Sequence, residues 1–355
     1  MAYTTIDDPS AYFQAATWSG SASTDTITFG GNSDLQLDWL WTKCRSNGHS
    51  HALMDTSRIT GGDYLPLFAD TTDVEQTAYD SELQSITSDG FTVGTQPHAG
   101  GDGKTYVGFA WKANGGTTAS NTSGSLTSTV QANTDVGFSI ITYTGNNTGG
   151  STIGHGLGAV PEWIMTKSRV ATKPWQCYHK SIGNDHFIDL DSTNAKVSAS
   201  ASWSNTTPTS SIVTLGNGDT NHTGAMVAYC FSSIQGYSKF GSFEGNNNAD
   251  GPFIYTGFKP AWVMTKNVDA SGKVWFVWDN ARDIDNVTNH TVSPDGDGTE
   301  QNDSTGAENR IDMLSNGFKI RATGTHINPD GQTLIYIAFA EQPFVSSEGV
   351  PTTAR

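Results

Sequence analysis

The sequence predicts an all-β protein, with little helix, built from three diverged copies of one sandwich module. Three observations lead to this prediction. A Trp-x-x-Thr-Lys motif occurs three times, at Trp39–Lys43, Trp163–Lys167 and Trp262–Lys266. Short runs rich in aromatic and β-branched residues, bounded by Gly, Asn, Asp or Pro, recur along the chain, whereas no window of a dozen residues has a helical stripe. The composition, with 39 Gly among 355 residues and 15% charged residues, is typical of short strands and tight turns.

The first copy shows the pattern of the module. After the motif strand at Trp39–Lys43 come an apolar stretch at His51–Asp55, the turn pair Asp89-Gly90, and a closing run at Tyr106–Trp111. Asp-Gly and Asn-Gly pairs favour the backbone angles of tight hairpin turns. We therefore expect hairpin-connected strands in each copy.

Residues 114–133 consist mostly of Gly, Thr, Ser and Asn and contain almost no apolar side chains. This composition favours an inserted linker between the first two copies. We expect the linker to end a first module that spans residues 1–134.

The second and third copies repeat the same order of runs and are expected to span residues 135–244 and 245–355. Their motif lysines lie roughly 100 residues apart, which is the size of a small independent β-domain. A sandwich of jelly-roll or lectin-like type fits such a module. The runs are Phe138–Tyr143, Trp163–Lys167, Trp175–His179, Ser211–Gly216 and Met226–Phe231 in the second copy, and Trp262–Lys266, Val274–Asp279, Ser315–Phe318 and Tyr336–Ala340 in the third.

The net charge of −16, from 19 basic and 35 acidic residues, disfavours nucleic acid as a partner because a negative field repels phosphates. No stretch approaches the roughly 18 apolar residues of a membrane-spanning helix, so we expect no membrane insertion. Residues 1–20 lack the basic start and apolar core of a secretion signal. We expect synthesis in a cytoplasm without export by that route.

The three cysteines, Cys44, Cys177 and Cys230, have neither an even count nor paired spacing. This pattern argues against a disulfide framework and against zinc. We expect core or incidental cysteines.

The motif lysines Lys43, Lys167 and Lys266 occupy one position in the three copies. They could contact a ligand, but lysines beside apolar strands more often guard an exposed strand edge against unwanted pairing, which is the interpretation favoured here. The spacing Asp55/Arg58 recurs as Asp279/Arg282. A salt bridge or a turn-stabilising hydrogen bond is favoured over a binding role.

A candidate calcium loop lies at Asp295, Asp297 and Glu300, where oxygen ligands alternate along the chain. The loop lacks the full EF-hand pattern, so a solvated acidic loop is the favoured alternative. The histidine pairs His49/His51 and His179/His186 match no metal-ligand spacing and are expected at the surface or in turns.

A glycan hydrolase needs two carboxyl groups held across a cleft. Asp189 and Asp191 have the spacing of such a pair on one strand, but no glutamate lies nearby and the other copies have no equivalent. The nucleophile-elbow and phosphate-loop motifs are absent as well. We predict no catalytic residues and no enzyme activity.

Two segments, Val227–Asn246 and Ala249–Lys266, together with the opening Met1–Gln14, resemble proteins encoded by marine tailed bacteriophages of cyanobacteria and Pelagibacter-like hosts. The resemblance covers nearly the whole chain. Members are described as virion structural or tail-fibre-like proteins, some with lectin-like sandwiches. The resemblance implies a virion protein of the tail, its fibres or the capsid surface, exposed on the particle. The implied partners are other virion proteins and further copies of the chain, with a homotrimer favoured.

A dedicated receptor-binding module is the alternative function. In that case exposed aromatic side chains would stack on host cell-surface glycans, and the candidates are Trp175, Trp203 and Tyr237. Burial in the core is the competing fate of such aromatic residues.

Overall fold

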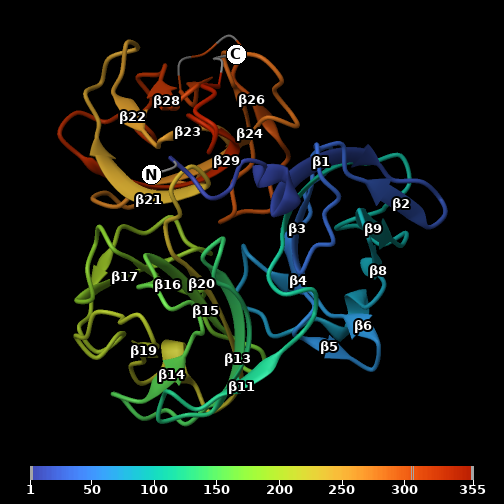
Figure 1. The fold of residues 1–355 in the computed structure, drawn as a ribbon, viewed down its shortest axis with the longest axis vertical. Helices are drawn as coiled ribbons and strands as arrows, with labels where there is room; N and C mark the ends of the chain where they lie inside the picture. Colours follow the sequence, from blue (N-terminus) through green and yellow to red (C-terminus); the bar gives the residue numbers. More distant parts are fainter. Residues whose placement is uncertain (1–2, 305, 307, 353–355) are drawn as a thin grey trace.

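The computed structural model describes residues 3–304, 306 and 308–352. These residues confirm the all-β prediction: they form 29 strands, and their only helical elements are three 3-10 turns, η1 Pro9–Ala11, η2 Thr77–Tyr79 and η3 Asp219–Asn221. The strands gather in three lobes around a centre (Figure 1). Lobe 1 carries β1 to β10, lobe 2 carries β11 to β20, and lobe 3 carries β21 to β29.

Lobe 1 contains a five-stranded sheet in the order β1-β10-β3-β4-β7 and a three-stranded sheet in the order β2-β9-β8, with β5 and β6 as a separate hairpin. The strands are β1 Phe13–Ser19, β2 Asp25–Thr28, β3 Trp39–Cys44, β4 Ala52–Asp55, β5 Ile59–Thr60, β6 Asp63–Tyr64, β7 Leu67–Phe68, β8 Leu83–Thr87, β9 Gly90–Val93 and β10 Thr105–Trp111.

Lobe 2 contains an eight-stranded sheet in the order β11-β12-β13-β20-β15-β16-β17-β18 and a small sheet of β14 and β19. The strands are β11 Ala119–Asn121, β12 Ser128–Asn133, β13 Phe138–Gly145, β14 Thr152–Gly154, β15 Trp163–Ser168, β16 Gln176–His179, β17 His186–Asp189, β18 Val197–Ser198, β19 Ile212–Thr214 and β20 Gly224–Phe231.

Lobe 3 contains a four-stranded sheet in the order β21-β29-β23-β24, a three-stranded sheet in the order β22-β28-β27, and the pair β25-β26. The strands are β21 Ser238–Glu244, β22 Phe253–Tyr255, β23 Phe258–Asn267, β24 Phe276–Asp279, β25 His290–Thr291, β26 Gln301–Asn302, β27 Ile311–Leu314, β28 Gly317–Ile320 and β29 Thr333–Pro343.

The motif strand occupies the same position in the large sheet of every lobe. It lies between the last long strand and the strand that follows it in sequence, in the orders β10-β3-β4, β20-β15-β16 and β29-β23-β24. Because side chains alternate along a strand, each motif strand faces two cores. Trp39 and Trp41 of β3 enter a core shared by all three lobes, whereas Leu40 enters a core confined to lobe 1. Each motif strand therefore contributes both to the core of its own lobe and to the core that joins the lobes.

The segment 114–133, expected to be a linker between the first two modules, contains two strands. Strand β12 pairs with β13 from Ser128 to Asn133, and β11 pairs with β12, so this segment extends the large sheet of lobe 2. Polar side chains supply its tertiary contacts: the Ser128 hydroxyl donates to the Gly154 carbonyl at 2.8 Å, and the Gln131 amide donates to Thr56 Oγ1 of lobe 1 at 2.8 Å. The polar composition of this segment gave no sign of strand β12, because its tertiary contacts are hydrogen bonds of polar side chains.

The expected module boundaries at residues 134 and 244 each fall between two strands that pair with each other. The first would separate β12 from its partner β13, and the second would separate β21 from its partner β29. Both strands belong to the lobe that follows them in sequence. The cysteine prediction is confirmed, because Cys44, Cys177 and Cys230 are buried free thiols.

Candidate functional site

The three motif lysines form the most distinctive polar arrangement in the molecule. Lys43, Lys167 and Lys266 lie on β3, β15 and β23, four residues after the motif tryptophan and therefore on the same face of the strand. All three residues are fully buried. Because their strands are internal, the expectation that these lysines guard exposed strand edges was wrong.

Each ammonium group joins its own lobe to a neighbour. Lys43 Nζ donates to the His49 carbonyl of lobe 1 at 2.5 Å and to the Asp297 carbonyl of lobe 3 at 2.9 Å. Lys167 Nζ of lobe 2 donates to the Thr71 carbonyl of lobe 1 at 3.0 Å and to a carbonyl of its own lobe. The lysines are thus inter-lobe clamps.

The third clamp closes the ring. Lys266 Nζ of lobe 3 donates to the Ser192 carbonyl of lobe 2 at 2.9 Å, and to the carbonyl of Lys273 in its own lobe. Lobe 2 is therefore clamped to lobe 1, lobe 3 to lobe 2, and lobe 1 to lobe 3. Burial lowers the pKa of all three motif lysines to about 8, since water no longer solvates the ammonium groups.

Three aspartates stand beside the clamps, one in each lobe. Asp70 accepts the backbone N–H of His51, Asp191 accepts that of Trp175, and Asp295 accepts that of a further aromatic residue, Trp275. Burial raises the pKa of Asp191 to about 6 and that of Asp295 to about 7, and it also raises the pKa of Asp70. The nearby lysine ammonium groups oppose this rise in pKa. Each clamp therefore contains carbonyl acceptors for the lysine and, close by, a partly buried carboxyl group.

Buried arginines reinforce two of the three junctions, and they confirm the predicted Asp-x-x-Arg salt bridges. Arg58 Nε contacts Asp55 at 2.5 Å, and its Nη1 reaches Glu75 at 2.6 Å. The other face of Glu75 binds Arg169 of lobe 2 at 2.8 Å. The Tyr229 hydroxyl, also from lobe 2, donates to Asp55 at 2.6 Å. The pair therefore lies inside a network that joins lobes 1 and 2.

The same arrangement recurs between lobes 3 and 1. Arg282 binds Asp279 at 2.5 Å and Glu300 at 3.2 Å, and Glu300 also binds Arg45 of lobe 1 at 2.8 Å. These ion pairs lower the pKa of Glu300 against the opposing effect of burial.

The residues of the candidate calcium loop bind other protein groups. Asp295 accepts a backbone N–H from Trp275, the Asp297 carbonyl binds Lys43, and the Glu300 carboxylate binds two guanidinium groups. Among the described residues, no group of three or more His, Cys, Asp or Glu side chains is placed to hold a metal ion. The loop's acidic pattern instead supplies the junction between lobes 3 and 1.

The predicted glycan contacts are buried and cannot stack on a sugar. Trp175 is fully buried, and its indole N–H donates to the Phe68 carbonyl of lobe 1 at 2.7 Å. Trp203 is 1% exposed and packs edge-on against Tyr178, and Tyr237, also 1% exposed, belongs to the shared core. The competing prediction of burial in the core is the one the structure supports.

Two of the four histidines expected at the surface or in turns, His51 and His179, are also buried, so that expectation was wrong for them. Burial lowers the pKa of His179 to about 3, which keeps its imidazole neutral at ordinary pH.

The aspartate pair weighed for hydrolysis lies at the junction of lobes 2 and 3. The Asp189 carbonyl accepts the indole N–H of Trp275 at 3.2 Å. Burial and the like charge of Asp191 raise the pKa of Asp189 to about 7. One carboxylate oxygen of each aspartate is buried without a hydrogen-bond partner among the described residues.

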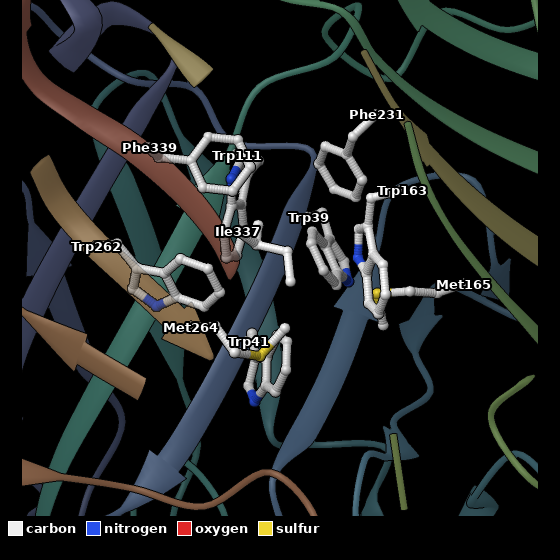
Figure 2. Close-up of a pocket in the computed structure, with 10 residues that line it drawn as sticks. All are labelled: Trp39, Trp41, Trp111, Trp163, Met165, Phe231, Trp262, Met264, Ile337 and Phe339. Carbon is white, nitrogen blue, oxygen red and sulfur yellow. The ribbon is translucent and has the colours of Figure 1, made fainter. Parts of the chain in front are cut away.

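A small cavity lies where the three lobes meet. Figure 2 shows its side chains converging from all three lobes. The cavity has a volume of about 10 Å³, enough for a single water molecule. The indole nitrogens of Trp39, Trp111 and Trp262 lack partners among the described residues, although these rings line the cavity. The space is too small for a ligand, so the centre of the ring is structural.

An open cleft with a volume of about 400 Å³ lies between lobes 1 and 3. Gln14 and Asn32 line it from lobe 1, and Asn280 and Glu341 line it from lobe 3. The Glu341 carboxylate is held by the Asn280 amide at 2.8 Å and by Lys259 at 2.7 Å. The size of the cleft falls within the range of small-molecule sites, and the amide and carboxylate groups that line the cleft suit a polyhydroxylated ligand.

Two exposed aromatic residues were missed at the sequence level. Phe253 and Tyr255 of β22 are 45% and 47% exposed and flank the buried Ile254. The alternation Phe-Ile-Tyr after Gly251-Pro252 is the signal that could have identified a strand with one aromatic face turned to solvent.

The chain belongs to the DUF7483 family, a domain of unknown function, whose model matches residues 8–343. No curated protein and no solved structure matches the chain. Among the described residues, no helix has the length and apolar character needed to cross a membrane.

Proposed function

We propose that this chain is a structural protein of a bacteriophage particle, exposed on the virion as a component of the tail or its fibres or as a capsid decoration. The sequence resemblance to phage virion proteins motivates the proposal. The observation that carries it is the closed ring of buried clamps, in which Lys43, Lys167 and Lys266 each bind a carbonyl group of another lobe. A part exposed on a particle must keep its shape in dilute surroundings, and a ring that buries its own polar cross-links suits that task.

The proposal includes an origin of the fold in three diverged copies of one lectin-like sandwich module. Three kinds of correspondence support it: the shared strand order of the large sheets, the motif lysines, and the matching arginine networks around Arg58 and Arg282. Glu75 and Glu300 each bridge two arginines across a junction between lobes, and common ancestry of the lobes would explain this similarity.

The particle component would bind other virion proteins and further copies of itself, with a trimer as the favoured assembly. Light scattering measures this directly, since a homotrimer would have three times the chain mass of 37.8 kDa. A monomer that persists at high concentration would count against self-assembly of the isolated chain.

A dedicated receptor-binding module is the second candidate function. The cleft between lobes 1 and 3 favours it, because Asn280 and Glu341 are fixed by hydrogen bonds and face a space of about 400 Å³. A glycan hydrolase is the third and weakest candidate. It would depend on Asp189 and Asp191, and turnover of a polysaccharide that Asp191→Asn abolishes would support it.

The test of the main proposal is localisation. An antibody raised against the purified chain should label intact particles at a defined position when they are viewed by electron cryomicroscopy, and the chain should appear in the protein composition of washed particles. Its presence in the infected-cell lysate combined with its absence from washed particles would overturn the proposal.

A further inference from the structure

The outer sheet of lobe 3 presents an aromatic pair to solvent. Among the described residues, Phe253 and Tyr255 are the two aromatic side chains that count as exposed, and they lie two positions apart on the edge strand β22 (Figure 1). Because side chains alternate along a strand, both rings lie on one face, with their α-carbons about 7 Å apart. Exposed aromatic residues that cluster on one face mark an interaction site more strongly than scattered apolar residues do.

Both rings lie close to neighbouring residues. Gly317 of β28, whose backbone pairs with Tyr255, is close to the edge of the Phe253 ring, since a Cβ atom at Gly317 would lie 3.1 Å from that ring. The Tyr255 hydroxyl lies 3.1 Å from the hydroxyl of Tyr3. Each ring therefore offers an exposed aromatic surface of the kind on which the C–H face of a sugar ring stacks.

Cations surround this pair although the chain as a whole carries a net charge of −16. Lys239 Nζ lies 5.2 Å from the centre of the Tyr255 ring and donates to the Tyr255 carbonyl at 3.2 Å. Lys319 is the cross-strand partner of Phe253, so both side chains project from the same face. Arg321 lies two residues further on, just beyond the end of β28.

Two carboxylates partly balance these three cations. Asp250 binds Lys319 at 2.7 Å and Arg321 at 3.2 Å, and Asp312 binds Arg321 at 3.1 Å. Within the described part of the chain, Lys239 forms no ion pair with a carboxylate, and the charges of Lys180 and Glu162 act on it with opposite signs. The patch therefore has a local excess of positive charge beside two stacking surfaces.

We infer that Phe253, Tyr255 and Lys239 form a binding site for an anionic polysaccharide, in which neighbouring sugar rings stack on the two aromatic rings and a carboxylate or sulfate group binds Lys239. The charge complementarity selects this ligand class over neutral glycans. The inference rests on the proposed function, since it supplies the host-surface ligand of an adhesive particle component.

The experiment measures binding of the purified full chain to three polysaccharides of matched length: a polyuronate, a sulfated galactan and neutral dextran. We expect saturable binding to the polyuronate or the sulfated galactan, weakened by added salt, and none to dextran. Preference between the two anionic polymers identifies carboxylate or sulfate as the recognised group. Equal binding to dextran, or no binding to either anionic polymer, would overturn the inference.

Variants locate the site. Phe253→Ala, Tyr255→Ala and Lys239→Gln should each weaken binding about tenfold. Ile284→Ala, which removes an apolar side chain that is 74% exposed elsewhere on lobe 3, should leave binding unchanged. Near-ultraviolet circular dichroism checks that the variants remain folded. Binding that survives in a folded Tyr255→Ala chain would overturn the assignment.

The outcome is separate from the test of the main proposal. A chain that is found in particles but does not bind anionic glycans would refute only this site. A chain that binds them but is absent from particles would refute only the particle assignment.

Discussion

Replacing Arg58 with methionine tests whether the buried ion-pair network holds lobes 1 and 2 together. Arg58 is 2% exposed, and its guanidinium group donates to the Asp55 and Glu75 carboxylates at 2.5 and 2.6 Å and to the carbonyls of Leu53 and Leu65 at 2.9 and 3.1 Å. Methionine keeps much of the apolar volume but removes every donor. The substitution therefore isolates the polar contribution of the network.

Most of the expected loss in stability comes from leaving the buried Asp55 carboxylate without its ion-pair partner. This carboxylate is fully buried, and without Arg58 its remaining donors among the described residues are the Tyr229 hydroxyl and the Ser57 backbone N–H. Removing one partner of a buried ion pair costs about 3–5 kcal/mol. Glu75 retains Arg169, so it adds little. We expect the free energy of unfolding to fall by about 4 kcal/mol, taken from the middle of that range.

Urea unfolding followed by tryptophan fluorescence measures the loss. Arg321→Met is the control, since Arg321 is partly exposed and its ion pairs lie at the surface; it should cost less than about 1 kcal/mol. The double variant Arg58→Met/Asp55→Asn should lose clearly less free energy of unfolding than the sum of the losses of the two single variants, because it no longer contains an unpaired buried carboxylate. A loss below about 1 kcal/mol for Arg58→Met alone would refute the reasoning.

Three further predictions address the clamps and the turns. Lys167→Met should lower the free energy of unfolding by about 1–3 kcal/mol, because the loss of two charge-assisted hydrogen bonds is offset in part by the removal of a buried cation. The control Lys180→Met, at the surface, should change the free energy of unfolding by less than about 1 kcal/mol in the same urea titration. The pKa of Asp189 is raised from 3.8 to about 7, so its protonation stabilises the fold fully below about pH 4, and this stabilisation is lost as the pH rises through 7. The free energy of unfolding of Asp189→Asn should therefore match that of the wild type at low pH and exceed it at pH 8 by on the order of 2–4 kcal/mol. A pH-independent difference in melting temperature would contradict this expectation. Gly90→Ala should cost more than about 1 kcal/mol, since φ is +128° there and a Cβ atom would lie 2.0 Å from the Ile27 carbonyl oxygen, whereas Gly296→Ala, with open space around it, should be nearly neutral by thermal denaturation.

The strands and the local ion pairs could be predicted from sequence because their signals are local. The run Trp39–Lys43 has the aromatic and β-branched character of a strand, and it forms β3. Asp55 and Arg58 lie three positions apart, so their contact requires only a turn. These features depend on neighbours along the chain.

The role of the lysines could not be predicted, since it depends on another lobe. The carbonyl that accepts from Lys43 belongs to Asp297, 254 positions away in the chain. For the same reason the sequence could not show which lobe buries Trp175, whose indole N–H donates to the Phe68 carbonyl of lobe 1. Local patterns identify a strand but not the lobe that packs against it.

The direction of the clamps has a consequence for assembly. Every lobe offers a lysine on one side and a receiving carbonyl on the other, and three such contacts return to the starting point. With lobe 3 deleted, the remaining pair would retain one unmatched face of each kind, pointing in different directions. We expect such truncated molecules to associate head to tail through these two unmatched faces.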